Sequence, residues 1–303
     1  MTWKFPVAGS LLVLPLTTIG FGAPPQITEI MPFGVRRGEA TQIRINGANL
    51  SGNPRLIAPF PFTMNPKPEI TKGSDAAHWT PEIKVPGDLA IGVYPVRIQT
   101  DDGISNPFLF AIGQLPQFAE KEDNSTFETA QQLPALPVVV EGTAQGNDVD
   151  YFRFAGKKGQ KIVLDAQCAR IGSGVDPTLR LTRANSARTF IAAADESPGL
   201  LTDCRLSATL PDDGDYIIEI SDSRYQGGGR PVYRLSIGSI PMAEELFPLG
   251  ARSGETVGLE FRGGTISSGA DGFAIAAITP RRLPANDWYQ PRIADPGSGL
   301  SEA

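Results

Sequence analysis

The stretch GNDVDYFRF at residues 146–154 decides between a helical and a β-sheet interpretation of this chain. Phe152 and Phe154 alternate in it with Tyr151 and Arg153. Because successive side chains of a strand point to opposite faces, this pattern predicts a strand with one buried and one exposed face. The glycine and asparagine at its start are typical of a turn that leads into a strand.

The same two-residue period recurs along most of the chain. Alternating runs between residues 24 and 113 predict a β-sandwich of Ig-like size. Those between residues 118 and 239 predict a second sandwich, of the jelly-roll type. A polar linker at 114–125 and a short helical pattern at 126–132 lie near the junction. The predicted fold class is therefore all-β, with tandem β-sandwiches.

An internal repeat relates the two ends of the chain. PFGVRRGEATQIRING at residues 32–47 aligns without gaps on PLGARSGETVGLEFRG at residues 248–263, an offset of 216 residues (248 minus 32). This match predicts that residues 240–303 begin a further Ig-like repeat, which is incomplete. Residues 284–303 are polar and rich in proline, so we expect a disordered tail and low order beyond about residue 265.

The first 22 residues (1–22) have the pattern of an export signal. Lys4 is their only charged side chain, residues 7–16 are apolar, and small residues precede a cleavage point after Gly22 or Ala23. A membrane anchor is the alternative, because the uncharged run at 5–27 is long enough to span a bilayer, although prolines dilute it. The pattern favours a secreted or cell-surface protein without a stable membrane span after cleavage.

Composition and motif content exclude several classes of function. The net charge is −6 and no basic stripe is present, so nucleic acid is not an expected partner. His78 is the only histidine and no G-x-S-x-G occurs, which argues against zinc catalysis and against an esterase-type nucleophile. A carboxylate pair for glycoside hydrolysis is compatible with any acidic protein. We therefore predict no enzyme, and expect His78, Asp203 and Asp222 in surface loops.

Two clusters of oxygen-bearing side chains could hold a hard cation. Glu120, Glu122 and Asn124 alternate in the linker, and Asp148 and Asp150 alternate before the aromatic strand. Alternate residues of an extended segment point the same way, so each cluster could line one side of a site. Calcium prefers carboxylate, amide and carbonyl oxygens. The alternative is a solvated acidic linker and an aspartate-rich turn.

Cys168 and Cys204 are the only cysteines. Each shares its parity with the apolar residues of a predicted strand, so both are expected to be buried. Export would permit a disulfide between them. Two separate buried thiols are an equally good interpretation, because sequence spacing does not give the distance between strands.

Residues 23–50, APPQITEIMPFGVRRGEATQIRINGANL, resemble the start of the IPT/TIG family of Ig-like domains. The second predicted sandwich resembles the bacterial pre-peptidase C-terminal (PPC) domain, which is related to the collagen-binding domains of collagenases. The matching segments are EKEDNS (120–125), GNDVDYFRF (146–154), KKGQKIVLDA (157–166), DPTLRL (176–181), LPDDGDYIIEI (210–220) and YRLSIG (233–238).

The PPC resemblance implies a β-sandwich accessory module and a possible calcium site. In calcium-binding relatives an E-x-E-x-N linker and an aspartate turn form that site, which points to Glu120, Glu122, Asn124, Asp148 and Asp150 here. This chain has a serine after the asparagine where an acidic residue often follows, so one charged ligand is missing.

The predicted function is a non-catalytic secreted or cell-surface binding or adhesion protein that recognises an extracellular protein or polysaccharide. The alternative is the accessory region of a secreted peptidase or other hydrolase whose catalytic part is absent from this chain. An independent glycosidase is the third hypothesis. Trp79, Tyr225 and Trp288 are candidate exposed contacts for a ligand.

Overall fold

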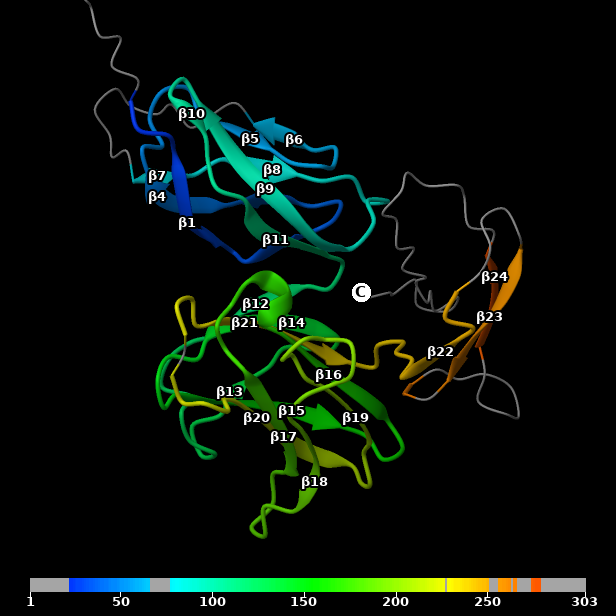
Figure 1. Ribbon diagram of the computed structural model, residues 1–303. Coiled ribbons are helices and arrows are strands. Elements are labelled where there is room, and N and C mark those ends of the chain that lie inside the picture. Colours follow the sequence, from blue (N-terminus) through cyan, green and yellow to red (C-terminus); the bar gives the residue numbers. More distant parts are fainter. Residues whose placement is uncertain are drawn as a thin grey trace, which may run out of the picture.

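The computed structural model describes residues 22–65, 77–226, 228–250, 256–262, 264–265 and 274–278 (Figure 1). Within these residues the regular elements are strands, apart from one short 3-10 helix, η1 (Ala169–Ile171). The all-β prediction is therefore confirmed. Residues 1–21 of the predicted export signal, the candidate contact Trp288 and the tail at 284–303 lie outside the described residues.

The first β-sandwich encloses its core between two layers of strands. β1 pairs antiparallel with β4, and the short β2 pairs parallel with β11 in the opposite layer. Ile43, Ile45 and Ile98, which belong to the predicted alternating runs, are at most 1% exposed. The strands of this sandwich are β1 (Gln26–Met31), β2 (Gly34–Arg36), β3 (Ala40–Gln42), β4 (Arg44–Ala48), β5 (Arg55–Ile57), β6 (Thr63–Asn65), β7 (His78–Trp79), β8 (Glu82–Lys84), β9 (Gly92–Thr100), β10 (Gly103–Ile104) and β11 (Phe108–Gly113).

The second β-sandwich consists of two five-stranded sheets. One has the order β12-β14-β21-β16-β19 and the other the order β13-β15-β20-β17-β18. From β14 to β21 the chain crosses between the sheets at every step except β17 to β18, which is the jelly-roll topology. The strands are β12 (Gln117–Ala119), β13 (Gln131–Gln132), β14 (Val138–Thr143), β15 (Val149–Gly156), β16 (Lys161–Gln167), β17 (Pro177–Arg183), β18 (Phe190–Ala194), β19 (Arg205–Thr209), β20 (Gly214–Asp222) and β21 (Val232–Gly238).

Three local expectations from the sequence are wrong. The predicted helix at 126–132 is a turn followed by β13, because the side chain and backbone of Thr126 and Thr129 bond to each other in a closed turn. His78 lies in β7 and not in a loop. Trp79, proposed as an exposed contact, is only 6% exposed because it packs into the core of the first sandwich.

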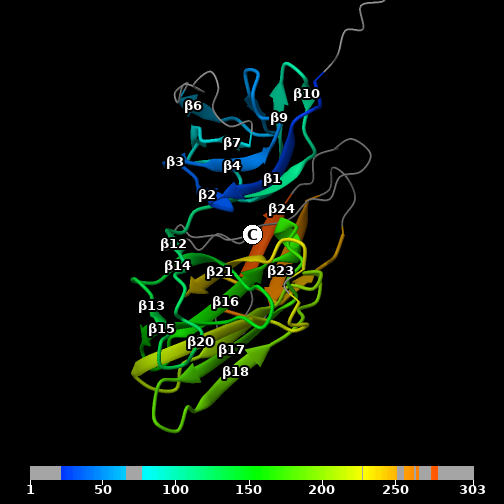
Figure 2. The same ribbon diagram turned by 90° about the vertical axis from the view of Figure 1, so that its left-hand side faces the viewer.

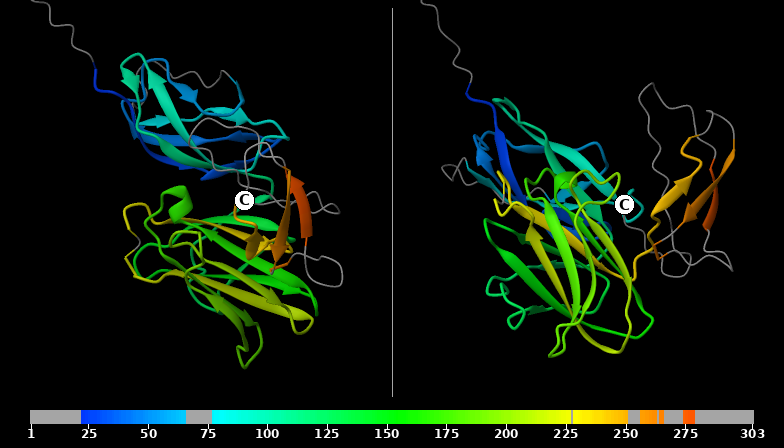
Figure 3. Two further views of the ribbon diagram at one scale, coloured as in Figure 1. Left: turned by 45° about the vertical axis from the view of Figure 1, so that its right-hand side comes forward. Right: turned by 60° about the horizontal axis from the view of Figure 1, so that its bottom comes forward.

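A third, three-stranded sheet follows the jelly roll (Figure 3), and its β22–β23 pair repeats the β1–β4 pair of the first sandwich. It comprises β22 (Glu245–Phe247), β23 (Val257–Arg262) and β24 (Ala274–Ile278). Ile30 pairs with Ile45 in the first sandwich, and Leu246 pairs with Phe261 in this sheet. Each residue of the second pair follows its counterpart in the first by 216 positions, which is the offset of the sequence repeat. β24 lies in the region beyond about residue 265 where low order was expected, and it pairs antiparallel with β23.

Phe33 lies at the contact between the two sandwiches. Its side chain is 3% exposed and packs with Ala111 of its own sandwich and with Ile171 and Val232 of the jelly roll. The guanidinium of Arg230 lies over the Phe33 ring, 5.6 Å from its centroid. Apolar burial of this kind holds domains in one relative orientation.

A polar cluster surrounds this apolar contact. Glu141 of β14 accepts hydrogen bonds from the Phe33 backbone N–H (2.8 Å), from Gln117 Nε2 (2.9 Å) and from Arg234 Nε (2.8 Å). Gln117 also donates to the Gly34 carbonyl at 2.7 Å. The segment predicted as a polar linker therefore contains a strand, β12 (Gln117–Ala119), that pairs with β14 and contacts the first sandwich through Gln117 (Figure 2).

We expect Phe33→Ala to uncouple the two sandwiches. Removing a buried phenylalanine costs about 3 kcal/mol or more, and here the loss falls on the contact between the sandwiches. Differential scanning calorimetry should show one cooperative transition for the wild type and two separated transitions for the variant. Met31→Ala, which truncates a side chain that is 45% exposed, is the control. A single unshifted transition for Phe33→Ala would contradict the prediction.

Candidate cation site and buried charge network

The end of the linker strand and the start of β15 bring together three of the five side chains that the sequence predicted as metal ligands. Glu120 follows β12 and its backbone N–H donates to the Glu141 carbonyl at 2.9 Å. The Asn124 carbonyl accepts from the Tyr151 backbone N–H at 3.0 Å. Asp150, in β15, is fully buried and Asn124 is 1% exposed. Glu120, Asn124 and Asp150 form the group called here the inner cluster.

Each carboxylate of the inner cluster has one satisfied and one free oxygen. Glu120 Oε2 accepts from the Thr143 backbone N–H at 2.9 Å, and Asp150 Oδ2 accepts from the Tyr233 hydroxyl at 2.7 Å. Glu120 Oε1, Asp150 Oδ1 and both amide atoms of Asn124 are buried without a hydrogen-bond partner. Buried polar atoms are nearly always satisfied. A proton shared between the Glu120 and Asp150 carboxyls would satisfy one free oxygen of each, and a cation held by the same oxygens is the alternative.

Burial raises the pKa of Asp150 to about 9, and the neighbouring charges of Glu120 and Asp148 act in the same direction. Burial also raises the pKa of Glu120, although the hydrogen bond from Thr143 opposes the shift. Both shifts have one physical cause, which is negative charge held away from water without a compensating cation. A bound cation would provide that compensation.

The outer predicted ligands occupy different positions. Glu122 is exposed, and Asp148 lies in the half-exposed turn before β15. Their charges reach the inner cluster, since both contribute to the raised pKa of Glu120. The expected strand-like alternation of Glu120, Glu122 and Asn124 is wrong, because Asp123 adopts the left-handed conformation (φ 79°) and turns the chain at that point.

Sequence reasoning missed Tyr233 and Gly142. Tyr233 is fully buried in β21 and its hydroxyl donates to Asp150, although 83 residues separate them. A Cβ at Gly142 would lie 2.4 Å from the Tyr233 hydroxyl oxygen and 2.6 Å from Glu120 Oε2, so only glycine leaves room for these groups. The YRLSIG segment contained Tyr233, but nothing in its spacing linked it to Asp150.

The donor set fits a hard cation better than a transition metal. The free atoms that face the cluster are two carboxylate oxygens and one amide group. The described part of the chain has no group of three or more His, Cys, Asp or Glu side chains that could together hold a metal ion. At the inner cluster the third donor would therefore be the amide of Asn124. Calcium takes six to eight oxygens, so backbone carbonyls or water would complete its shell.

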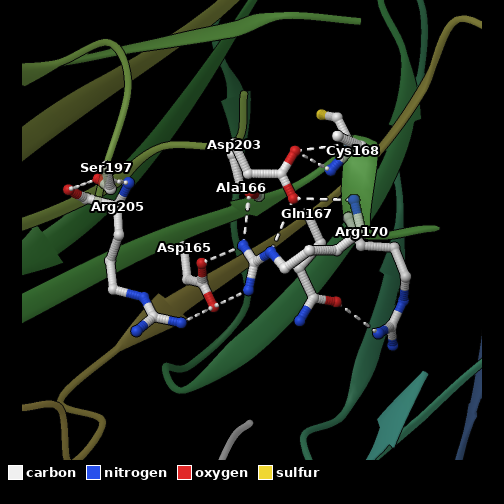
Figure 4. Close-up of polar contacts among 10 residues, drawn as sticks. Asp165, Ala166, Gln167, Cys168, Arg170, Ser197, Asp203 and Arg205 are labelled. Atoms are coloured by element: carbon white, nitrogen blue, oxygen red, sulfur yellow. Dashed lines mark hydrogen bonds and ion pairs between the residues drawn. The ribbon is translucent and has the colours of Figure 1, made fainter. Parts of the chain in front are cut away.

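A second charged group, centred on Asp203, has its partners in place (Figure 4). Asp203 is fully buried and accepts from the backbone N–H groups of Cys168, Ala169 and Arg170, and from Arg170 Nε at 2.7 Å. These bonds hold the first turn of η1. Asp203 lies in a loop, as expected, but it is buried and not at the surface, because its carboxylate satisfies backbone donors that the sequence does not reveal.

Asp165 extends this group on β16. It forms ion pairs with Arg170 (2.6 Å) and Arg205 (2.9 Å). Burial alone would raise the pKa of Asp165, but the two arginines together lower it below its ordinary value. Asp222, also expected in a loop, ends β20 and accepts from the Asp176 and Gln226 backbone N–H groups. These buried carboxylates stabilise turns.

Cys168 and Cys204 are both fully buried, as predicted, and both are free thiols. Cys168 precedes η1 and Cys204 precedes β19. Burial raises the pKa of each thiol, and the charge of Asp203 or Asp165 acts in the same direction. Such thiols are poor nucleophiles at neutral pH. The proposed disulfide remains a prediction.

No helix in the described part of the chain is long and apolar enough to cross a membrane. Of the predicted exposed contacts, Tyr225 is 58% exposed.

Comparisons with known proteins show a loose structural likeness. No family model matches the chain, and no curated protein is similar to it in sequence. A periplasmic inhibitor of g-type lysozyme, PliG from Aeromonas hydrophila, is 17% identical, with 40% of this chain and 96% of that chain covered and a TM-score of 0.25. SGBP-B from a xyloglucan utilisation locus of Bacteroides uniformis is 11% identical, with 71% and 73% covered and a TM-score of 0.22.

A structure of carbohydrate-binding modules from the β-sandwich superfamily is 12% identical, with 72% of this chain and 98% of that chain covered and a TM-score of 0.23. Likenesses at this level carry no weight for function.

Proposed function

We propose that this chain is a non-catalytic binding protein of the cell exterior, stabilised by calcium, whose ligand is an extracellular protein or polysaccharide. The observation that carries the proposal is the inner cluster, in which Glu120 Oε1, the Asn124 amide and Asp150 Oδ1 are buried without hydrogen-bond partners. The Glu120 and Asp150 carboxyls interact with each other, and the Asn124 backbone bonds to the residue after Asp150. Extracellular modules bind calcium with dissociation constants of about 0.1–1 mM, which suits medium outside the cell.

Calcium is held in this proposal by Glu120, Asn124 and Asp150. Glu122 and Asp148 add negative charge nearby and increase the attraction for the cation. The bound ion would join the end of β12 to the start of β15. Because β12 also contacts the first sandwich through Gln117, the ion stabilises the part of the jelly roll that positions its neighbour.

The resemblances support a binding role. The segments that resemble the PPC domain all fall on the jelly roll, and those that resemble IPT/TIG domains fall on the first sandwich. Both families consist of accessory modules. The buried carboxylates outside the inner cluster, such as Asp165, Asp203 and Asp222, are engaged in structural bonds. The pattern at residues 1–22 supports export.

The proposal is tested by incubating the purified full chain with a panel of extracellular polymers. The panel holds gelatin, fibronectin, hydroxyethyl cellulose, mannan, amylopectin, polygalacturonate and heparin. We expect retention by at least one polymer, without release of reducing ends or new amino termini. Release of product by the wild type, absent from a matched preparation of denatured chain, would overturn the non-catalytic assignment. Retention by none of the polymers would overturn the binding assignment.

A further inference from the structure

The sheet β13-β15-β20-β17-β18 of the jelly roll (Figure 1) has an outward face on the side away from the core. A row of polar and charged side chains that the inner cluster does not use lies on this face. Tyr151 lies directly opposite Glu219, and Glu219 lies directly opposite Arg180. Their neighbours in sequence point into the core of the jelly roll, so these three side chains point outward. The phenol of Tyr151 in β15, the carboxylate of Glu219 in β20 and the guanidinium of Arg180 in β17 are therefore neighbours across three adjacent strands.

The groups of this row interact with one another. Partial burial raises the pKa of Tyr151, the charge of Glu219 raises it further, and Arg188 and Arg180 oppose the shift. These three charged groups therefore lie near the Tyr151 hydroxyl. Ile217 also lies on the outward face, opposite Arg153, yet it is only 1% exposed. The larger side chains around it form a continuous layer.

Two aromatic rings flank the row, each beneath an arginine. Phe190 of β18 is 54% exposed, and Arg180 lies 5.3 Å from its centroid. Arg188 lies 4.5 Å from the centroid of Phe127. A guanidinium stacked on a ring keeps the N–H groups at its edge available for hydrogen bonds, and its orientation is already fixed. Half of the Phe190 surface also remains free for an apolar group.

The charges on this face balance. Arg153 pairs with Asp215 at 3.6 Å, Arg188 pairs with Glu128, and Arg180 lies opposite Glu219. The face therefore has fixed donors and fixed acceptors in equal number and no net charge. A polyanion gains little from such a face, particularly on a chain of net charge −6. An uncharged ligand rich in hydroxyl groups, each both donor and acceptor, matches it.

We propose that the face formed by Tyr151, Arg180, Phe190 and Glu219 binds a neutral polysaccharide. Arg180 donates to sugar hydroxyls, Glu219 accepts from them, and the exposed part of the Phe190 ring packs against the apolar face of a pyranose. A long polymer suits an extended sheet face that crosses several strands. This inference rests on the proposed binding function and names its ligand class and its site.

The experiment is affinity gel electrophoresis of the full chain in gels that contain hydroxyethyl cellulose, mannan or amylopectin. Polygalacturonate and gelatin gels represent polyanionic and protein ligands. We expect retardation by at least one neutral polysaccharide, and a loss of affinity of about tenfold in Arg180→Ala and in Phe190→Ala, since a charge-assisted hydrogen bond is worth that factor. The controls are Arg55→Ala and Tyr225→Ala, which truncate an exposed arginine and an exposed aromatic ring elsewhere. Unchanged melting temperatures show that the variants are folded.

The outcomes separate this inference from the function on which it rests. Retardation only by gelatin or polygalacturonate overturns the neutral-polysaccharide assignment and leaves a binding protein. A second outcome is that a neutral polysaccharide retards the wild type, with retardation lost in Tyr225→Ala and kept in Arg180→Ala. That result overturns only the placement of the binding site on the face formed by Tyr151, Arg180, Phe190 and Glu219. If none of the five polymers retards the chain, the neutral-polysaccharide assignment is overturned. The larger polymer panel of the binding test then decides whether the binding function fails as well.

Discussion

Calcium at about 10 mM is expected to raise the melting temperature of the full chain by about 5–10 °C relative to EDTA. At a concentration about one hundred times the dissociation constant, a ligand bound only by the folded state adds about 2.7 kcal/mol to its stability. Asp150→Asn should abolish this shift. The variant still offers an acceptor to the Tyr233 hydroxyl and removes a buried carboxyl, so it should be at least as stable as the wild type in EDTA.

Glu122→Gln is the matched control, because Glu122 is exposed and contributes charge from outside the inner cluster. It should keep most of the calcium shift. Equal shifts in Asp150→Asn and in the wild type, or no shift in the wild type, would exclude the cation site. Magnesium at the same concentration tests selectivity, since its smaller shell and strict octahedral geometry suit a site of this kind less well.

The calcium shift should also grow with pH. The pKa of Asp150 is raised to about 9 in the cation-free fold, whereas an unfolded aspartate has a pKa of about 3.9. Between these values the folded state holds a proton that the unfolded state has lost, so the stability of the cation-free protein falls as pH rises. Calcium displaces that proton, and its binding strengthens over the same range. Melting curves at pH 5, 7 and 8.5 measure this effect. The difference in melting temperature between calcium and EDTA should increase with pH.

The strands were predictable because burial in a sandwich imposes a period of two on the sequence. Phe152 and Phe154 carried that signal, and both are buried. The repeat was equally visible, since Ile45 and Phe261 occupy the same register in two sheets. The jelly-roll crossovers followed from strand count and spacing alone.

The inner cluster was only partly predictable. Glu120, Asn124 and Asp150 were identified by residue type, but the direction of each side chain depends on backbone angles that the sequence does not determine. The left-handed residue Asp123 breaks the assumed alternation and leaves Glu122 in solvent. Tyr233 reaches Asp150 only through the packing of the two sheets. Long-range contacts of this kind leave no local pattern.

Asp203→Ala should destabilise the chain by about 3–5 kcal/mol, which is the usual cost of removing one partner of a buried ion pair. The side chain is fully buried and accepts bonds from three backbone N–H groups at the start of η1. Its loss leaves those donors unsatisfied. Arg170 would retain Asp165, which it already shares with Arg205, and the Ala166 carbonyl. Urea unfolding followed by circular dichroism measures the change in the free energy of unfolding.

Asp212→Ala is the control for this effect. Asp212 pairs with Arg183 at 2.9 Å, a distance close to that of the Asp203–Arg170 pair, but its side chain is 49% exposed. Water screens the exposed pair, so its removal should cost less than about 1 kcal/mol. The difference between the two variants isolates the contribution of burial, since both remove an aspartate paired with arginine in the same sandwich. Equal costs for Asp203→Ala and Asp212→Ala would show that the buried network contributes no more than an ordinary surface pair, and that other contacts fix the first turn of η1.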